Sequence, residues 1–494
     1  MYSIGYDIGS SSIKAAIIET ATGKNIALVT EPGEEMKMIA LHNGWAEQNP
    51  DDWWLHICNA TKKLLQENNI KSEDITGVGI SYQMHGLVVV DKDGNPLRNS
   101  IIWCDSRAVE TGQKAFDDLG NDTCASQLLN SPSNFTASKL KWVKENEPEL
   151  YSKIDKFMLP GDYIAYKLSG TICSTISGLS EGIFWDFKEN SVADWLLEYY
   201  GIDKSLVPEI KDTFSEQGII SEAGAAASGL AIGTPILYRA GDQPNNALSL
   251  NVFNPGEVAA TGGTSGVIYA VTDNLSVKES SRVNNFAHVN YTTSEQKIGK
   301  LLCLNCAGIQ YRWLLNNLDV ASYDEMNTLA SSVPVGSEEL IIHPFGNGAE
   351  RIFNNKTIGT NIADLNLNIH TKAHMCRAAL EGIAFAFVYG MQILESDGIQ
   401  PSVIRAGNDN LFRSEIFSNT IATLINHDIE IYNTTGAIGA ARACQLHNPK
   451  NFETFGKQII DNDFVMKFEP LSEKEAYEKA YLKWKNKLTQ LIKN

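Results

Sequence analysis

Two short turns rich in glycine, serine and threonine place the strongest constraint on how this chain can fold. The first turn, residues 9–12, lies between the apolar runs Tyr2–Asp7 and Ile13–Glu19, and the second, residues 262–266, lies between two similar runs. Apolar, β-branched runs on both sides of a tight turn predict a β-hairpin. Small turns present backbone N–H groups and hydroxyls to one point, which suits an anion such as phosphate. We therefore expect two hairpins that hold a nucleotide between two halves of the molecule.

The length of 494 residues exceeds what one hydrophobic core usually supports, so two domains are expected. The loop that precedes the strand Pro235–Ala240 marks the end of the first domain, which gives domains of residues 1–240 and 241–494. Each half places strands and a glycine turn first and helices afterwards. This order predicts a duplicated α/β domain.

Hydrophobic periodicity places the other main elements. A helix is expected to start at Pro50, with acidic residues in its first turn, and the last helix carries an apolar stripe that can cover the core. The segment Ala378–Leu394 is apolar but short and contains Glu381, so it reads as a core helix and not as a membrane span. The expected helices are 50–65, 138–144, 151–168, 245–250, 370–396, 411–426 and 472–494, and the expected strands include 25–30, 75–82, 86–90, 257–261 and 267–271.

Composition narrows the range of partners. The net charge is −18 and no basic run occurs, which argues against nucleic acid as a partner. No secretion signal opens the chain and its eight cysteines are scattered, which indicates a reduced, cytoplasmic setting. Cys303 and Cys306 have the spacing of a metal pair but lack a second pair, so they are interpreted as structural thiols. Small molecules are the expected partners, without a membrane, and a homodimer is left open.

Asp7, followed by the turn residues Ser10, Ser11 and Ser12 and by Lys14, is the first candidate site. A carboxylate at a strand end beside a phosphate-sized turn can hold Mg²⁺, which offsets the negative charge of both groups. A simple hairpin turn is the alternative interpretation. The chain contains neither a Walker-type nor a Rossmann-type glycine motif, so a nucleotide has to be held in another way.

The order and spacing of three glycine turns resemble one superfamily. The hairpins after Asp7 and at Gly262 and the late turn 406–410 are similar to the two phosphate segments and the adenosine segment of the sugar kinases, actin and Hsp70. The resemblance implies an α/β fold of two actin-like, or ribonuclease H-like, domains with the active site in the cleft between them. It extends over nearly the whole chain and is specific to the FGGY family of carbohydrate kinases.

Three further segments resemble the xylulokinases of this family. Residues 81–86 (SYQMHG) are similar to their Q-M-H-G segment, 103–107 (WCDSR) to W-x-D-x-R, and 134–140 (NFTASKL) to N-F-T-A-x-K-L. The resemblance implies ATP-dependent phosphorylation of D-xylulose to D-xylulose 5-phosphate. Another ketose or polyol, such as ribulose, sedoheptulose or glycerol, is the alternative substrate, and a non-catalytic nucleotide-binding or sugar-sensing protein is the alternative class.

The resemblance also implies roles for single residues. Asp242 takes the position of the catalytic base, although on the sequence alone a helix cap explains it as well. The resemblance implies that the sugar is bound by Met84, His85, Trp103, Asp105 and Gln243. For ATP it implies Asp7 (also the Mg²⁺ ligand), Ser10, Ser11, Ser12, Lys14, Gly263, Thr264, Gly308, Arg312, Gly407 and Asn410.

The chain departs from the family pattern at two places. Ala406 precedes Gly407 where a double glycine is usual, and residues 348–353 (GAERIF) replace the usual G-E-R-T-P. Both positions lie outside the expected chemical centre, so the departures bear on nucleotide affinity or loop closure more than on the type of reaction.

Overall fold

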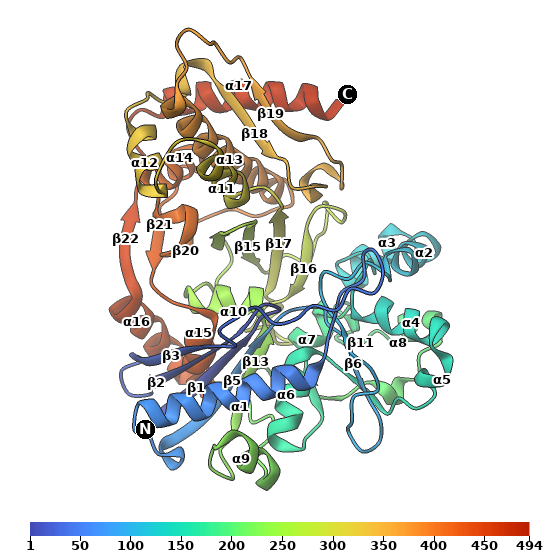
Figure 1. Ribbon diagram of the computed structural model, residues 1–494. Coiled ribbons are helices and arrows are strands. Elements are labelled where there is room, and N and C mark those ends of the chain that lie inside the picture. The colour runs from blue at the N-terminus through green and yellow to red at the C-terminus, as the bar shows by residue number, and fades with distance from the viewer. Residues whose placement is uncertain (494) are drawn as a thin grey trace.

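The computed structural model describes residues 1–493 and contains two large β-sheets, one in each half of the molecule (Figure 1). In the first sheet β1 pairs antiparallel with β2 and parallel with β5, and β13 runs parallel to β5. The carboxyl ends of β1, β5 and β13 therefore meet at one edge of the sheet. Its strand order is β13 (Ile236–Gly241), β5 (Ile75–Tyr82), β1 (Tyr2–Ile8), β2 (Ile13–Glu19) and β3 (Asn25–Glu31).

Helices cover both faces of the first sheet. On one face α1 (Pro50–Glu67) packs on β2 and β3; its N-terminus is capped by Asn49, which accepts a hydrogen bond from the backbone N–H of Asp51. On the other face α15 (Gly436–Ala443) packs on β1, β2 and β5. A Cβ atom at Gly5 would lie 2.1 Å from a backbone oxygen of α15, and one at Gly79 would lie 1.9 Å from another. Glycine at both positions lets the helix backbone lie directly on the strands.

The second sheet has seven strands, with β14 and β15 forming its central hairpin. The long helix α13 (Lys372–Ser396) packs on β15 and β17 of this sheet, and α14 (Glu415–Ile425) packs on β22. The helices α11 (Gly308–Asn317), α12 (Tyr323–Ser331) and α17 (Lys474–Lys493) pack in turn on α13. By length and composition α13 could cross a membrane, but 83% of its most apolar window is buried, as in the core helix of a globular domain. The strand order is β16 (Asn284–Ala287), β17 (Ile298–Leu304), β15 (Gly266–Thr272), β14 (Glu257–Gly262), β20 (Val403–Gly407), β21 (Ile429–Tyr432) and β22 (Phe464–Phe468).

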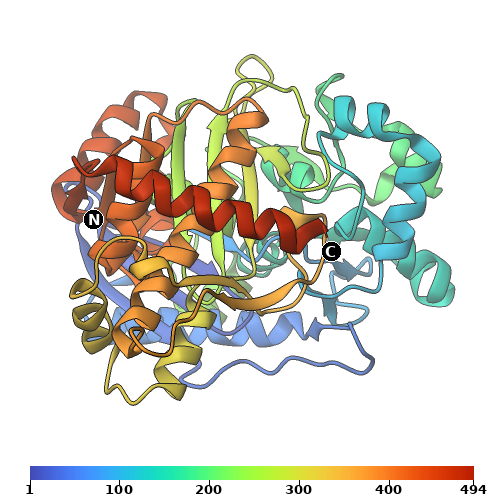
Figure 2. The same cartoon turned by 90° about the horizontal axis from the view of Figure 1, so that it is seen from above.

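Smaller elements complete the two halves. Seen from above, the red C-terminal helix lies across the C-terminal half, while the cyan and teal helices of the first half form a lobe to one side (Figure 2). The paired short strands are β4 (Glu47–Gln48) with β7 (Ser100–Ile101), β6 (Val88–Val90) with β8 (Lys156–Met158), β9 (Cys173–Thr175) with β12 (Glu209–Lys211), β10 (Trp185–Asp186) with β11 (Ser191–Val192), and β18 (Ile341–Phe345) with β19 (Gly359–Ala363). The remaining α-helices are α2 (Val109–Leu119), α3 (Asn121–Thr123), α4 (Thr136–Asn146), α5 (Pro148–Tyr151), α6 (Pro160–Ser169), α7 (Ile176–Glu181), α8 (Asp194–Tyr200), α9 (Glu222–Ser228), α10 (Asp242–Ser249), α11 (Gly308–Asn317), α12 (Tyr323–Ser331), α14 (Glu415–Ile425), α16 (Phe452–Asp463) and α17 (Lys474–Lys493).

The structure confirms both hairpins and corrects two helices. The expected helix 151–168 is wrong in its first half, because residues 156–158 form β8, which pairs with β6, and α6 begins only at Pro160. The expected helix 411–426 begins at Glu415, after a short 3-10 turn. The division of the chain at residues 240 and 241 stays a prediction; it falls before the last residue of β13, Gly241.

Candidate active site

Two acidic residues lie at the carboxyl ends of the parallel strands in the first sheet. Asp7 is next to last in β1 and is in register with Ser81 of β5, whose Oγ donates a 2.9 Å hydrogen bond to Asp7 Oδ1. Asp242 directly follows β13, whose last residue Gly241 is in register with Tyr82. The edge where parallel strands end is a common place for ligands in α/β sheets. The fold therefore brings Asp7 and Asp242 to the same edge.

The electrostatic environment couples these two carboxylates. Burial raises the pKa of Asp7. The pKa of Asp242 is raised to about 7, first by burial and second by the charge of Asp7, against hydrogen bonds from Gln243 that lower it. Asp242 is also the first residue of α10, where the positive end of the helix dipole favours its charged form. An acid poised near neutral pH suits proton transfer.

The predicted sugar-binding residues Met84 and His85 come just after β5, the strand next to β13. A Cβ atom at Gly241 would lie 2.6 Å from Met84 Cγ, so Met84, which is 4% exposed, packs against the strand end that carries Asp242. His85 follows in a left-handed backbone conformation, with φ of 62°. Its ring packs against Phe135, with 4.7 Å between the ring centroids. Gln243 follows Asp242 in the first turn of α10 and is half-buried, and its amide bonds to the Asp242 carboxylate.

The side chain of Trp103 is 53% exposed, and its Nε1 lies 3.5 Å from Ser10 Oγ in the first hairpin turn. The predicted sugar contact of Asp105 stays a prediction. Asp105 is completely buried, and its carboxylate accepts hydrogen bonds from the backbone N–H of Ala46 at 2.6 Å and from the guanidinium of Arg107 at 2.7 Å. These bonds hold the segment after Trp103 in place, and they leave the Asp105 carboxylate shielded from solvent in this conformation.

A cavity of about 390 Å³ lies beside the second hairpin turn. Its walls include five of the predicted nucleotide residues, together with the stacked rings of Tyr311 and Tyr323. The start of α11 is bonded to the turn, since Gly308 N–H donates to Gly263 O at 2.9 Å. A Cβ atom at Gly308 would lie 2.5 Å from that oxygen, so only glycine allows this approach. The predicted residues that line the cavity are Gly263, Thr264, Gly308, Arg312 and Asn410.

The remaining predicted nucleotide residues do not line this cavity. Ser10, Ser11, Ser12 and Lys14 belong to the first hairpin, and Gly407 ends β20. The charge of Lys14 nevertheless lowers the pKa of Asp409, which burial raises, so the first hairpin faces the late turn of the other half. The late turn also lies near the second hairpin, since a Cβ atom at Gly263 would lie 3.7 Å from Asn410 Nδ2. The binding of a nucleotide between the two halves stays a prediction.

The residues at the strand ends fit a bound divalent cation. Asp7 and Asp242 concentrate two carboxylates whose mutual repulsion a cation would offset. Within residues 1–493 no cluster of three or more histidine, cysteine or acidic side chains is arranged to hold a metal. Mg²⁺ bound through one carboxylate and substrate phosphates does not need such a cluster. Asp7 is the residue placed to supply that carboxylate.

The altered segment 348–353 lies against residues 305 and 306, which immediately precede α11. Glu350 is buried, and its carboxylate accepts hydrogen bonds from the backbone N–H groups of Asn305 at 2.9 Å and Cys306 at 2.7 Å. Burial raises the pKa of Glu350 to about 7. Arg351 donates to Asn284 of β16. This segment is therefore bonded to the second sheet despite its departure from the family pattern.

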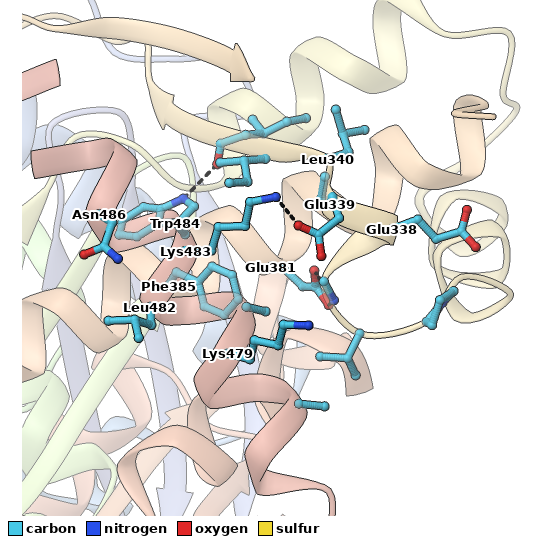
Figure 3. A pocket seen from close by; sticks show the side chains of 18 residues that line it. Glu338, Glu339, Leu340, Glu381, Phe385, Lys479, Leu482, Lys483, Trp484 and Asn486 are labelled. Atoms are coloured by element: carbon cyan, nitrogen blue, oxygen red, sulfur yellow. Dashed lines mark hydrogen bonds and ion pairs between the residues drawn. The ribbon is translucent and has the colours of Figure 1, made fainter. Parts of the chain in front are cut away.

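A second cavity, of about 490 Å³, lies away from these residues under the C-terminal helix α17 (Figure 3). Lys483 pairs with Glu339 at its rim, and Trp484 Nε1 donates a 2.9 Å hydrogen bond to Ile342 O. Glu381, the acidic residue of the core helix, is buried at its base and paired with Arg377 at 2.6 Å. None of the predicted site residues lines this cavity.

Sequence reasoning missed three residues of the site. Ser81 bonds Asp7, Glu181 bonds the backbone of His85, and Gly436 allows α15 to start beside Asp7, since a Cβ there would lie 2.6 Å from Asp7 Oδ2. Glu181 carries a signal that could have been used, because it is an isolated acid in the otherwise uncharged run 171–185. Ser81 and Gly436 depend on strand and helix pairings over long sequence distances, which leave no local pattern.

Two family models together match most of this chain. The family model described as the N-terminal domain of the FGGY family of carbohydrate kinases matches residues 2–249, and the model of the C-terminal domain matches residues 258–446. The xylulose kinase of Haemophilus influenzae is 26% identical over 502 residues, which cover 99% of both chains. The structure is similar to those of xylulose kinase from Rhodospirillum rubrum (TM-score 0.88, 23% identity, 99% of both chains) and of glycerol kinase from Plasmodium falciparum with ADP (TM-score 0.87, 19% identity, 99% of this chain and 98% of the other).

Proposed function

Because this chain belongs to the FGGY family of carbohydrate kinases, we propose that it transfers the γ-phosphoryl group of ATP to the terminal hydroxyl of D-xylulose, giving D-xylulose 5-phosphate and ADP. One observation carries the proposal: the half-buried carboxylate of Asp242 directly follows β13, whose last residue lies against Met84, and its pKa is raised to about 7 by burial and by the charge of Asp7. The choice of sugar is supported by the names of relatives such as the Haemophilus influenzae xylulose kinase.

Asp242 acts as the general base. Its carboxylate accepts the proton of the sugar hydroxyl while that oxygen bonds to the γ-phosphorus, and the bond from phosphorus to the bridging oxygen of ADP breaks. Since phosphoryl transfer is loose, positioning of the hydroxyl matters more than early removal of its proton. Met84, His85, Trp103 and Gln243 position the sugar against this carboxylate.

The nucleotide is held by both hairpins. Asp7 would hold Mg²⁺, which when bound neutralises charge on the β- and γ-phosphates. Thr264 meets the transferring phosphate, and the residues near adenosine are Gly308, Arg312, Gly407 and Asn410. The serines of the first turn and Lys14 approach the phosphates from the other side, across the two halves. A cytoplasmic location and a homodimer stay predictions.

A kinase of the same family with another ketose or polyol is the second candidate. The two family models cover both halves of the chain without naming a sugar, and the Haemophilus influenzae xylulose kinase is only 26% identical to it. A non-catalytic protein would need the hairpins but would have no use for Asp242 beside Met84 and His85.

A substrate panel tests the proposal. Purified protein is assayed for ADP release with D-xylulose, D-ribulose, sedoheptulose and glycerol, and mass spectrometry and NMR identify the phosphorylated product. D-xylulose is expected to have the highest kcat/KM, with phosphate at the terminal hydroxyl. A preference for another sugar would change the proposed substrate but leave the proposed kinase activity in place. ADP release that does not depend on sugar would overturn both proposals.

The role of Asp242 is tested with a matched pair of variants. Asp242→Asn is expected to lower kcat by about 10² to 10⁴ while nucleotide affinity stays within about twofold of the parent. Asp461→Asn, at an exposed position of α16 remote from the site, is the control and should behave like the parent. Near-parental turnover of Asp242→Asn would show that another group accepts the proton.

A further inference from the structure

His85 occupies a strained position whose support comes from two buried ionisable residues outside the predicted site. Its φ of 62° lies in the left-handed region, which is unfavourable for a residue with a Cβ atom. Such a conformation persists only where the surroundings hold it. The groups that hold it are Glu181, at the end of α7, and Lys139, in α4.

Glu181 and Lys139 bind the two backbone polar groups of His85. Glu181 Oε2 accepts a 3.1 Å hydrogen bond from His85 N–H, and Lys139 Nζ donates at 2.8 Å to His85 O and at 2.9 Å to Ile102 O. Glu181 is 1% exposed and Lys139 is completely buried. Burying two ionisable side chains is costly, so the backbone they hold is strongly determined.

The imidazole of His85 is held in one tautomer. Its Nδ1 lies 2.9 Å from the backbone oxygen of Glu181, and a carbonyl oxygen only accepts, so Nδ1 carries the proton and donates it. Burial, and after it the charge of Lys139, lowers the pKa of His85 to about 3, which leaves the ring neutral. A neutral ring protonated at Nδ1 has a lone pair at Nε2.

The free nitrogen is the part of His85 left for a ligand. Within residues 1–493 no group is hydrogen-bonded to Nε2, and 16% of the side chain is exposed. Phe135 and Phe286 pack against the ring, with centroids 4.7 and 5.2 Å away. Both carboxyl oxygens of Glu181 lie 3.3 Å from the position of a Cβ at Gly241, so the same carboxyl group also lies behind the strand end that carries Asp242.

We propose that Glu181 and Lys139 are positioning residues that hold His85 in its left-handed conformation and Nδ1–H tautomer, so that Nε2 accepts a hydrogen bond from a sugar hydroxyl. This inference rests on the proposed function and deepens it. His85 selects a substrate that donates a hydrogen bond at this point, while Asp242 receives the proton of a different hydroxyl. A sugar with a methoxy group or hydrogen in place of that hydroxyl is disfavoured.

A double-mutant cycle on the full chain tests the link between Glu181 and His85. With the best sugar of the substrate panel, His85→Ala and Glu181→Ala are each expected to lower kcat/KM for the sugar by about tenfold or more, with KM for ATP unchanged. In the His85→Ala background, Glu181→Ala should add less than about twofold. Glu181→Gln, which keeps an acceptor oxygen for His85 N–H, should retain activity within about threefold. Additive losses, or parental activity of Glu181→Ala, would overturn the proposal.

A matched control and a direct measurement separate this role from general stability. Glu381→Ala removes a buried glutamate of the other half and should change thermal stability without a selective effect on KM for the sugar. If Glu181→Ala fails to fold, ¹⁵N NMR of the parental protein can report the protonation state of the His85 ring directly. Comparison with His85→Ala identifies the His85 signal among those of the nine histidines. A neutral ring protonated at Nδ1 is expected at pH 7, and protonation at Nε2 would overturn the inference. This result does not depend on which sugar is the substrate, so it stands apart from failure of the proposed function.

Discussion

Ser81 Oγ donates a 2.9 Å hydrogen bond to Asp7 Oδ1 across the neighbouring parallel strands β5 and β1. It is the only side-chain hydrogen bond to the Asp7 carboxylate within residues 1–493. Burial raises the pKa of Asp7, and this hydrogen bond lowers it, so the serine favours the charged form that would hold a cation.

Ser81→Ala removes that donor without adding volume. A hydrogen bond to a charged group contributes about 1.5 to 3 kcal/mol, so affinity for Mg²⁺ together with ATP should fall about tenfold or more, and KM for the sugar should stay unchanged. Isothermal titration with the magnesium nucleotide measures the change. Ser205→Ala, remote from the site and exposed, is the control. Unchanged affinity in Ser81→Ala would contradict the role assigned to Asp7.

The rate should depend on pH through Asp242. The pKa of this acid is raised to about 7, and a base works only when it is deprotonated, so kcat/KM for the sugar should rise with pH up to about 7 and level off above it. Asp7 contributes to the raised value, and its replacement by Asn should move the rise to lower pH. The profile of the residual activity measures this shift. A flat profile between pH 5 and pH 8 would contradict the assignment.

Gly308→Ala should disturb the nucleotide cavity. The added Cβ would lie 2.5 Å from the backbone oxygen of Gly263, which cannot move without displacing the second hairpin. Overpacking of this kind costs about 1 to 3 kcal/mol, so KM for ATP should rise about tenfold. Gly33→Ala is the matched control, since nothing lies within 4 Å of the added atom. Equal behaviour of the two variants would argue that ATP binds elsewhere.

Asp463→Ala should lower the stability of the fold. Asp463 pairs with the buried guanidinium of Arg442 in α15, whose Nε also donates at 2.7 Å to Gly23 O in the turn between β2 and β3. Removing the acid leaves a buried charge unpaired, which costs about 3 to 5 kcal/mol. Urea unfolding followed by circular dichroism measures the loss. Asp461→Ala, two positions earlier and exposed, should unfold like the parent.

Local patterns in the sequence predicted the elements that depend on near neighbours. The predicted bounds of the first hairpin's strands and the predicted start of α1 at Pro50 agree with the structure to within a residue or two. Tight turns and helix caps depend on adjacent residues, so local sequence is enough to predict them. Residues 156–158 were misread as helix because their partner, β6, lies about 68 residues earlier, at positions 88–90. Pairing over that distance overrides local preference.

The candidate site also contains residues that could be predicted from the sequence and contacts that could not. Residues on the hairpins and strand ends could be assigned from the family resemblance, and those near the second hairpin meet in one cavity. The burial of Asp105 against Arg107 and the backbone of Ala46 could not be predicted, because Ala46 lies 59 positions earlier in the chain. The hydrogen bond from His85 N–H to Glu181 joins residues 96 positions apart. It also depends on a left-handed backbone conformation of His85 that no local sequence pattern predicts.

The seating of α15 on the first sheet has a consequence for synthesis on the ribosome. When the strand that ends at Gly241 has emerged, the glycines Gly5 and Gly79 still form an uncovered face, because the helix that packs there starts at residue 436. The nascent first half is therefore expected to stay open to protease until nearly the whole polypeptide has been translated, and a fragment cut at residue 240 should be poorly soluble on its own.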